Sequence, residues 1–137
     1  QLSSLINKKS GVMGVSEVSS DMREIDAAIK EGNEQAKLAL DMYHYRIAKY
    51  IGAYTAALNG VDIIVFTGGV GENQISTRKN ICDRLSYLGV KVDDEKNNSR
   101  GEEVVISSPD SAVKVVVIPT DEELMIAKDT EEIVSAL

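Results

Sequence analysis

The chain has 137 residues and an apolar fraction of 43%, which is enough for one domain with a hydrophobic core. Its net charge of -7 disfavours a nucleic-acid partner, because such affinity comes largely from basic groups. No apolar run approaches the roughly 20 residues that cross a bilayer, so we expect no membrane partner. The single cysteine, Cys82, cannot form an internal disulfide, which favours a reducing compartment such as the cytoplasm.

The first residues have the pattern of a helix that is ending. Leu2, Leu5 and Ile6 share one side, and Gly11 stands where a helix commonly stops. The chain therefore starts inside an element, and we expect it to be part of a longer protein.

A second helix is expected to end at Gly32. Ser20 or Asp21 suits its N-cap, and Glu24 stands in a capping-box relation to Asp21. The apolar face of this helix consists of Met22, Ile25 and Ile29. Capping alone would explain Asp21, and Arg23 would then be a solvated residue of the first turn.

The longest periodic segment runs from Asn33 to the stop at Asn59-Gly60. Its apolar stripe comprises Ala36, Leu40, Tyr43, Ile47, Ile51, Tyr54 and Leu58. Further apolar residues widen this surface, so a second domain or subunit would cover it. The lone His44 lies with polar neighbours and has no second ligand at metal-binding spacing, which indicates a structural or surface residue.

The stretch 61–73, VDIIVFTGGVGEN, combines an apolar run with three glycines. The run 63–66 lacks polar alternation, which predicts a strand covered on both faces in a parallel or mixed sheet with flanking helices. Gly68, Gly69 and Gly71 permit positive φ and close approach of a ligand, and Asn73 suits a helix cap. The stretch matches neither a Walker A loop nor a dinucleotide fingerprint, so these residues alone allow a tight turn or a ligand loop.

Helix and strand patterns alternate over the remaining residues. We expect a helix at 74–88, a short strand at 90–92, a solvated charged connection at 93–103, and strands at 104–106 and 113–118. Cys82 is expected to be a buried small hydrophobe.

The last expected helix begins after Pro119. Thr120 suits its N-cap, with Glu123 at the capping-box position. The helix dipole alone would explain Glu122 and Glu123 in the first turn. The expected inner face consists of Leu124, Ala127, Ile133 and Val134.

Three short pieces occur in an order that resembles one enzyme family. They are SSDMR at 19–23, FTGGVGEN at 66–73 and VIPTDEELMIA at 117–127. Together they resemble the C-terminal part of the acetate kinase family, and the likeness extends over essentially the whole chain. Two positions depart from the family pattern: Gly68 stands where alanine is common, and Asp121 where asparagine is common.

The resemblance implies an α/β fold of the actin, Hsp70 and sugar-kinase superfamily, in which two related domains flank a nucleotide cleft. Residues 1–137 would form a single domain, the C-terminal nucleotide-binding part, with a mixed sheet flanked by helices. By the same resemblance, the nucleotide-binding residues are Asp21, Met22, Arg23, Gly69, Val70, Gly71, Glu72 and Asn73. Glu122 would be a ligand of Mg²⁺. The catalytic residues of the family lie upstream of the segment that matches this chain, so none is expected here.

The resemblance also implies reversible phosphoryl transfer between ATP and acetate, giving ADP and acetyl phosphate, by a cytoplasmic homodimer. The chain alone is expected to be inactive. A propionate or butyrate kinase of the same family is an alternative, because the acyl pocket lies outside this sequence. A non-catalytic module for nucleotide binding or dimerisation is a second alternative, although the presence of all three motifs disfavours it.

Overall fold

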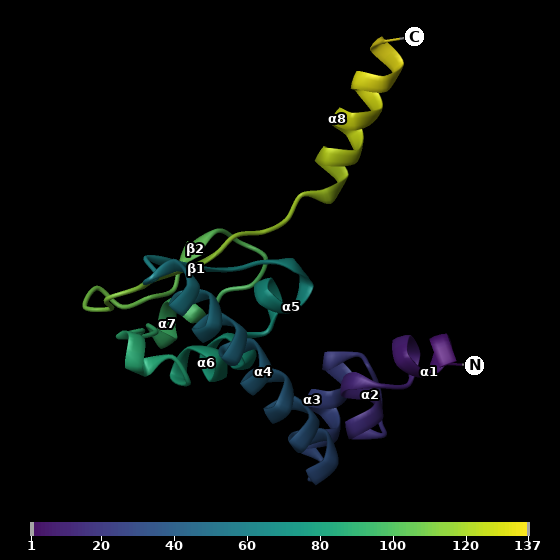
Figure 1. The fold of residues 1–137 in the computed structure, drawn as a ribbon, viewed down its shortest axis with the longest axis vertical. Coiled ribbons are helices and arrows are strands. Elements are labelled where there is room, and N and C mark those ends of the chain that lie inside the picture. Colours follow the sequence, from purple (N-terminus) through teal and green to yellow (C-terminus); the bar gives the residue numbers. More distant parts are fainter. Residues whose placement is uncertain (1, 137) are drawn as a thin grey trace.

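The computed structural model describes residues 2–136 and is organised around one long helix (Figure 1). Three helices precede it: α1 (Leu2–Lys8), α2 (Gly11–Ser16) and α3 (Met22–Lys30). The long helix α4 (Glu34–Leu58) begins where the Asn33 side chain accepts a hydrogen bond from the Ala36 backbone. It ends at Asn59, which adopts the left-handed conformation of a C-cap, as predicted.

A three-stranded mixed sheet follows α4. Its strands are β1 (Ile63–Phe66), β2 (Val104–Val105) and β3 (Lys114–Val117). The central strand β3 is parallel to β1 and antiparallel to β2. The α/β class with a mixed sheet is therefore confirmed. The strand expected at 90–92 is wrong, because only Val92 forms a bridge, with Ser107.

Short helices connect β1 to β2. They are α5 (Gly68–Asn73), α6 (Ile75–Asp83), the 3-10 turn η1 (Ser86–Leu88) and α7 (Asp94–Asn97). The helix expected at 74–88 is thus divided into α6 and η1. The connection expected at 93–103 also contains a helix, since the Asp93 carboxylate accepts hydrogen bonds from Glu95 N and Lys96 N at the start of α7.

The hydrophobic core lies on one face of the sheet. Ile64 and Phe66 of β1 point into it with Val115 and Val117 of β3, and α6 supplies Ile81. The alternate residues of β1 lie on the opposite face, where Ile63 is 53% and Val65 48% exposed. The prediction of a strand covered on both faces is therefore wrong for residues 2–136.

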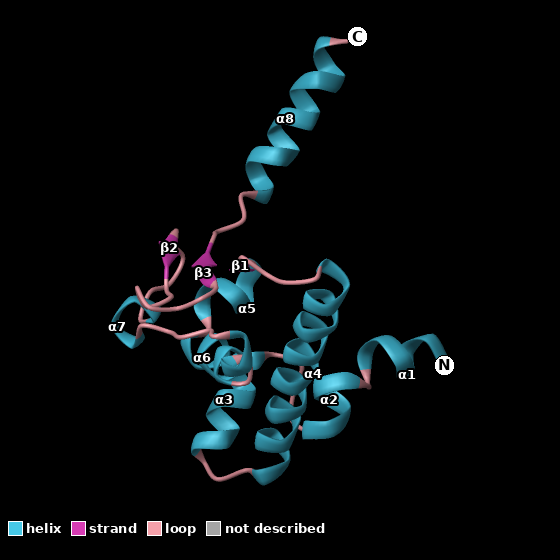
Figure 2. Ribbon diagram, turned by 60° about the vertical axis from the view of Figure 1, so that its left-hand side comes forward, coloured by secondary structure: helices cyan, strands magenta, loops and turns pink. Residues whose placement is uncertain are grey.

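Helix α4 packs against α2, α3 and α6, and Figure 2 shows α2 and α3 beside it. Its apolar stripe is longer than the surface that these helices cover. Ala36 at one end is fully buried, whereas Tyr54 and Leu58 at the other end are 64% and 73% exposed. His44 is buried beside α6, where its Nε2 lies 3.0 Å from Thr77 Oγ1. The surface alternative for His44 is therefore wrong, and the structural one is confirmed.

Helix α8 (Glu122–Ser135) extends away from the other elements (Figures 1 and 2). None of its described residues is buried. The inner face predicted for it is exposed at Leu124, Ala127, Ile133 and Val134. These side chains therefore have no covering partner within residues 2–136. No helix in this range combines the length and the apolarity that crossing a membrane requires.

Candidate functional site

The segment Asp21–Arg23 begins α3. The Asp21 carboxylate caps the helix by accepting a hydrogen bond of 2.9 Å from the Arg23 backbone, so the capping prediction is confirmed. The same carboxylate pairs with the Arg23 guanidinium, whose Nη2 lies 2.6 Å from Oδ2. Hydrogen bonds from Arg23 lower the pKa of Asp21 to about 2. This site therefore presents an ionised carboxylate and a pre-oriented guanidinium that is largely open to solvent.

The glycine segment is a short helical turn, α5, directly after β1. Gly68 has a φ of 69°, which favours glycine, and allows β1 to turn into α5. Gly71 is buried, and a Cβ at this position would lie 3.1 Å from the carbonyl carbon of Phe66. At Gly69 a Cβ would meet no atom within 4 Å. Gly71 is thus required for packing of α5 on β1, whereas the main chain at Gly69 is accessible.

Asn73 does not cap the following helix. Its Nδ2 donates a hydrogen bond of 3.0 Å to the Gly69 carbonyl, four residues earlier. The N-cap position of α6 is Gln74, which makes no side-chain capping bond. The prediction that Asn73 caps α6 is therefore wrong, because its side chain is bonded within α5 instead.

A cleft of about 1280 Å³ brings the first two motifs together. One side is formed by Asp21, Met22 and Arg23, and another by Gly69, Val70 and Asn73. Gly71 and Glu72 are not among its lining residues, and neither is Glu122. Six of the eight predicted nucleotide-binding residues therefore share one cavity.

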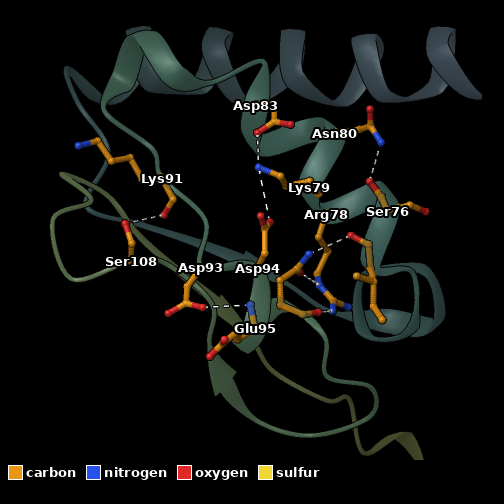
Figure 3. A network of polar contacts seen from close by, with 12 residues as sticks. Ser76, Arg78, Lys79, Asn80, Asp83, Lys91, Asp93, Asp94, Glu95 and Ser108 are labelled. Atoms are coloured by element: carbon orange, nitrogen blue, oxygen red, sulfur yellow. Dashed lines mark hydrogen bonds and ion pairs between the residues drawn. The ribbon is translucent and has the colours of Figure 1, made fainter.

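A third side of the cleft is formed mainly by residues of the segment 93–103, which was expected to be a solvated connection. Asp94, Asn97, Asn98 and Arg100 line it, together with Lys79 of α6. Lys79 Nζ lies 3.0 Å from an Asp83 oxygen and 3.6 Å from an Asp94 oxygen, and so links α6 to α7 (Figure 3). Asp93 followed by helix formers was the available signal for α7, but no local pattern places these residues at the cleft.

The second and third motifs are joined by hydrogen bonds. Glu72 Oε1 accepts one from Thr120 N at 2.9 Å and one from Thr120 Oγ1 at 3.1 Å. These bonds, the backbone one first, lower the pKa of Glu72. Since Thr120 is engaged in this way, the N-cap of α8 is Asp121, whose carboxylate accepts from Leu124 N. The prediction that Thr120 caps α8 is therefore wrong.

Glu122 is an exposed residue of the first turn of α8. Within residues 2–136, no group of three or more His, Cys, Asp or Glu side chains is arranged to hold a metal ion. Mg²⁺ bound to a nucleotide nevertheless needs only one or two protein carboxylates, because phosphates and water supply its other ligands. A single free carboxylate at Glu122 fits that partial role.

Two further groups with reactive chemistry are enclosed by the core. Burial lowers the pKa of His44 and raises the pKa of Cys82 to about 12. A thiol with this pKa is not a nucleophile at neutral pH, and the prediction of a buried hydrophobic cysteine is confirmed.

The chain is similar to proteins of one family over nearly all its length. A family model described as the acetokinase family matches residues 1–128. An acetate kinase of Phocaeicola vulgatus is 67% identical over 129 residues, which are 94% of this chain and 32% of that protein. An acetate kinase of Clostridium botulinum is 62% identical over 133 residues, which are 97% of this chain and 34% of that protein.

Solved structures agree with these relatives. The crystal structure of Porphyromonas gingivalis acetate kinase matches with a TM-score of 0.88 and 60% identity, over 97% of this chain and 34% of that one. A propionate kinase from Francisella tularensis matches with a TM-score of 0.82 and 40% identity, over 92% of this chain and 32% of that one. The chain spans about a third of the length of these proteins. The fold expected from the resemblance is confirmed, and the chain belongs to the acetokinase family.

Proposed function

We propose that the chain is the C-terminal nucleotide-binding part of a two-domain kinase that transfers a phosphoryl group reversibly between ATP and acetate. The products of the forward reaction are ADP and acetyl phosphate. The cleft that places Asp21–Arg23 beside Gly69–Asn73, in a chain of the acetokinase family, carries this proposal.

The nucleotide would lie in this cleft. The exposed guanidinium of Arg23 offers a planar surface for stacking on a base or for pairing with oxygen acceptors. The open main chain at Gly69 admits close approach of the ligand. Gly71 and Glu72 do not line the cleft, so their role would be to hold the α5 residues that do.

Glu122 would be the protein ligand of Mg²⁺, directly or through water. When bound with the nucleotide, the ion would neutralise negative charge on the phosphates. The Glu72–Thr120 bonds support this role because they tie the segment that leads to Glu122 to the glycine segment.

The remaining chemistry would come from outside this chain. Phosphoryl transfer depends on positioning and on cationic groups around the transferring phosphate. We propose that the rest of the longer kinase supplies those groups and the carboxylate pocket, and that residues 1–137 alone are inactive.

We also propose a cytoplasmic homodimer. Large exposed side chains on α4 support a further interface, namely Leu38, Met42, Tyr45, Tyr50 and Tyr54. The buried free Cys82 is consistent with a reducing compartment. Light scattering of the full-length protein tests the dimer, and a monomer at micromolar concentration would contradict it.

Isothermal calorimetry of the full-length protein with Mg²⁺ and ATP or ADP tests nucleotide binding. We expect a dissociation constant in the micromolar to millimolar range, on the order of -4 to -8 kcal/mol. No binding in this range would favour a non-catalytic module whose exposed α4 surface serves only dimerisation.

A propionate kinase is the second candidate, because a propionate kinase structure matches over 92% of the chain. The acetate kinase structure is more similar, at 60% against 40% identity, which favours acetate. Steady-state rates of the full-length protein with acetate, propionate and butyrate distinguish them. A catalytic efficiency about tenfold higher with propionate, equal to about 1.4 kcal/mol, would overturn the preference for acetate.

A further inference from the structure

Arg78 is a fully buried arginine on α6 whose partners are all uncharged. Its side chain is 0% exposed, and none of the ion pairs among residues 2–136 involves it. It does not line the cleft. A buried charge is costly unless its hydrogen-bonding groups are satisfied, so the surroundings of this guanidinium have to be well ordered.

The guanidinium makes five hydrogen bonds to two segments. Nη1 donates to the carbonyls of Gly71 and Glu72, both at 2.9 Å. Nη2 donates to the carbonyls of Asn97 at 2.6 Å and Ser99 at 2.9 Å, and Nε donates to Asn97 Oδ1 at 2.8 Å. All five N–H groups that an arginine carries are thereby used.

The two bonded segments belong to different sides of the cleft. The end of α5 follows Gly69 and Val70 on one side, and Asn97 and Asn98 line another. Asn97 Nδ2 also donates to the Ile75 carbonyl, which attaches the same segment to α6. The Arg78 guanidinium is therefore the group that bonds to both sides at once, while Asn97 and Lys79 add further links between α6 and α7.

We propose that Arg78 is a positioning residue that fixes the separation of these two sides and so sets the affinity of the cleft for the nucleotide. This inference rests on the proposed function, because it assumes that the nucleotide occupies this cleft. Arg78 acts through Gly71, Glu72 and Asn97 and does not itself touch the ligand.

A lysine at position 78 tests the geometry while it keeps the positive charge. Lysine has a single nitrogen and three donors, so it cannot reach both segments with five bonds. In the full-length protein, Arg78→Lys should raise the KM for ATP by about tenfold and leave the KM for acetate within about twofold. Lower stability alone would reduce the folded fraction, and hence the apparent kcat, without changing either KM.

Two variants are matched controls. Arg84→Lys makes the same change on an exposed arginine at the end of α6, which pairs with Asp41 at 3.4 Å and does not line the cleft. Ser99→Ala alters a residue that meets Arg78 only through its main-chain oxygen. Both should keep the wild-type KM for ATP.

Asn97→Ala is a second variant that is measured alone if Arg78→Lys folds poorly, and in a double-mutant cycle with it otherwise. Asn97→Ala removes the acceptor of the Nε bond and should also raise the KM for ATP. If the two residues act through one contact, the fold-increase in the KM for ATP of the double variant should be well below the product of the two single fold-increases.

Each outcome decides the inference. A folded Arg78→Lys protein with the wild-type KM for ATP overturns it, as do fully independent effects of Asn97→Ala and Arg78→Lys. A wild-type full-length protein that binds no ATP is a different result, because it contradicts the proposed function before any variant is measured.

Discussion

The glycine segment α5 and the helix α8 carry two parts of the proposed site, but they are held in different ways. α5 packs on Phe66 through Gly71 and is bonded to the buried Arg78 through two carbonyls. α8 has no buried residue, and two hydrogen bonds between Glu72 and Thr120 tie the segment before it to α5. The glycine segment of the proposed site is thus held by contacts within this chain, whereas the placement of Glu122 depends on an exposed connection.

The largest effect is expected at Gly71, where the packing of α5 is tightest. Gly71→Val adds atoms next to the Phe66 main chain and should lower the free energy of unfolding by about 1–3 kcal/mol, measured by urea denaturation of the full-length protein. Gly69→Val is the matched control, since a Cβ there meets nothing within 4 Å. It should weaken nucleotide binding and leave stability within about 0.5 kcal/mol. Equal stability of the two variants would remove the contrast between these glycines.

The second prediction concerns Glu122 on the exposed helix α8. Glu122→Gln removes the carboxylate charge proposed for Mg²⁺ and should raise the Mg²⁺ concentration for half-maximal rate by about tenfold, with the KM for acetate unchanged. Glu123→Gln makes the same change one residue along and is the control. A Mg²⁺ dependence that is the same in both variants argues against a ligand role for Glu122.

The third prediction tests the link between the two regions. Glu72→Ala removes both bonds to Thr120 and frees the segment that leads to Glu122. We expect the Mg²⁺ requirement of the full-length protein to rise by about threefold, because a neutral or surface hydrogen bond contributes only on the order of 1 kcal/mol. Glu72→Gln keeps an acceptor oxygen and should show a smaller rise. Identical kinetics of Glu72→Ala and wild type would show that α8 is placed by other contacts.

The smallest effect is expected at Asp21, on the exposed edge of the ordered cleft. Its pKa is lowered from 3.8 to about 2, so its contribution to stability is present above pH 3.8 and is lost as pH falls towards 2. Asp21→Asn should therefore have a lower Tm than wild type near neutral pH, and the two Tm values should converge on acidification. The pair is exposed, so the difference will be small. A Tm difference that is constant over this pH range would contradict the lowered pKa of Asp21.

Local patterns predicted much of the fold. The start of the long helix at Asn33, its stop at Asn59 and the strand at Ile63–Phe66 each depend on neighbouring residues, and the structure confirms all three. The cap of α8 was assigned wrongly for the opposite reason. Thr120 is bonded to a carboxylate 48 positions earlier in the chain, and a local capping rule has no information about such a partner.

The predicted site divides in the same way. The first two motifs contain Asp21–Arg23 and Gly69–Asn73, and six of these eight residues line one cleft. No pattern indicated that Arg78 is buried behind that cleft, because an arginine next to Lys79 in a polar run is typical of a solvated helix. The tertiary structure explains the burial, because it brings five oxygen acceptors from two segments around the guanidinium.

The sequence by itself determined the family, the strand that leads into the glycine segment and the two motifs that line the proposed nucleotide cleft, since each of these depends on short motifs or on periodicity. The tertiary structure decided which glycine is required for packing, which residues form the third side of the cleft, and which charged side chain holds its sides together. These features depend on atoms brought together from distant positions. Their positions follow from the packing of α6 and α7 behind α5, which no local pattern specifies.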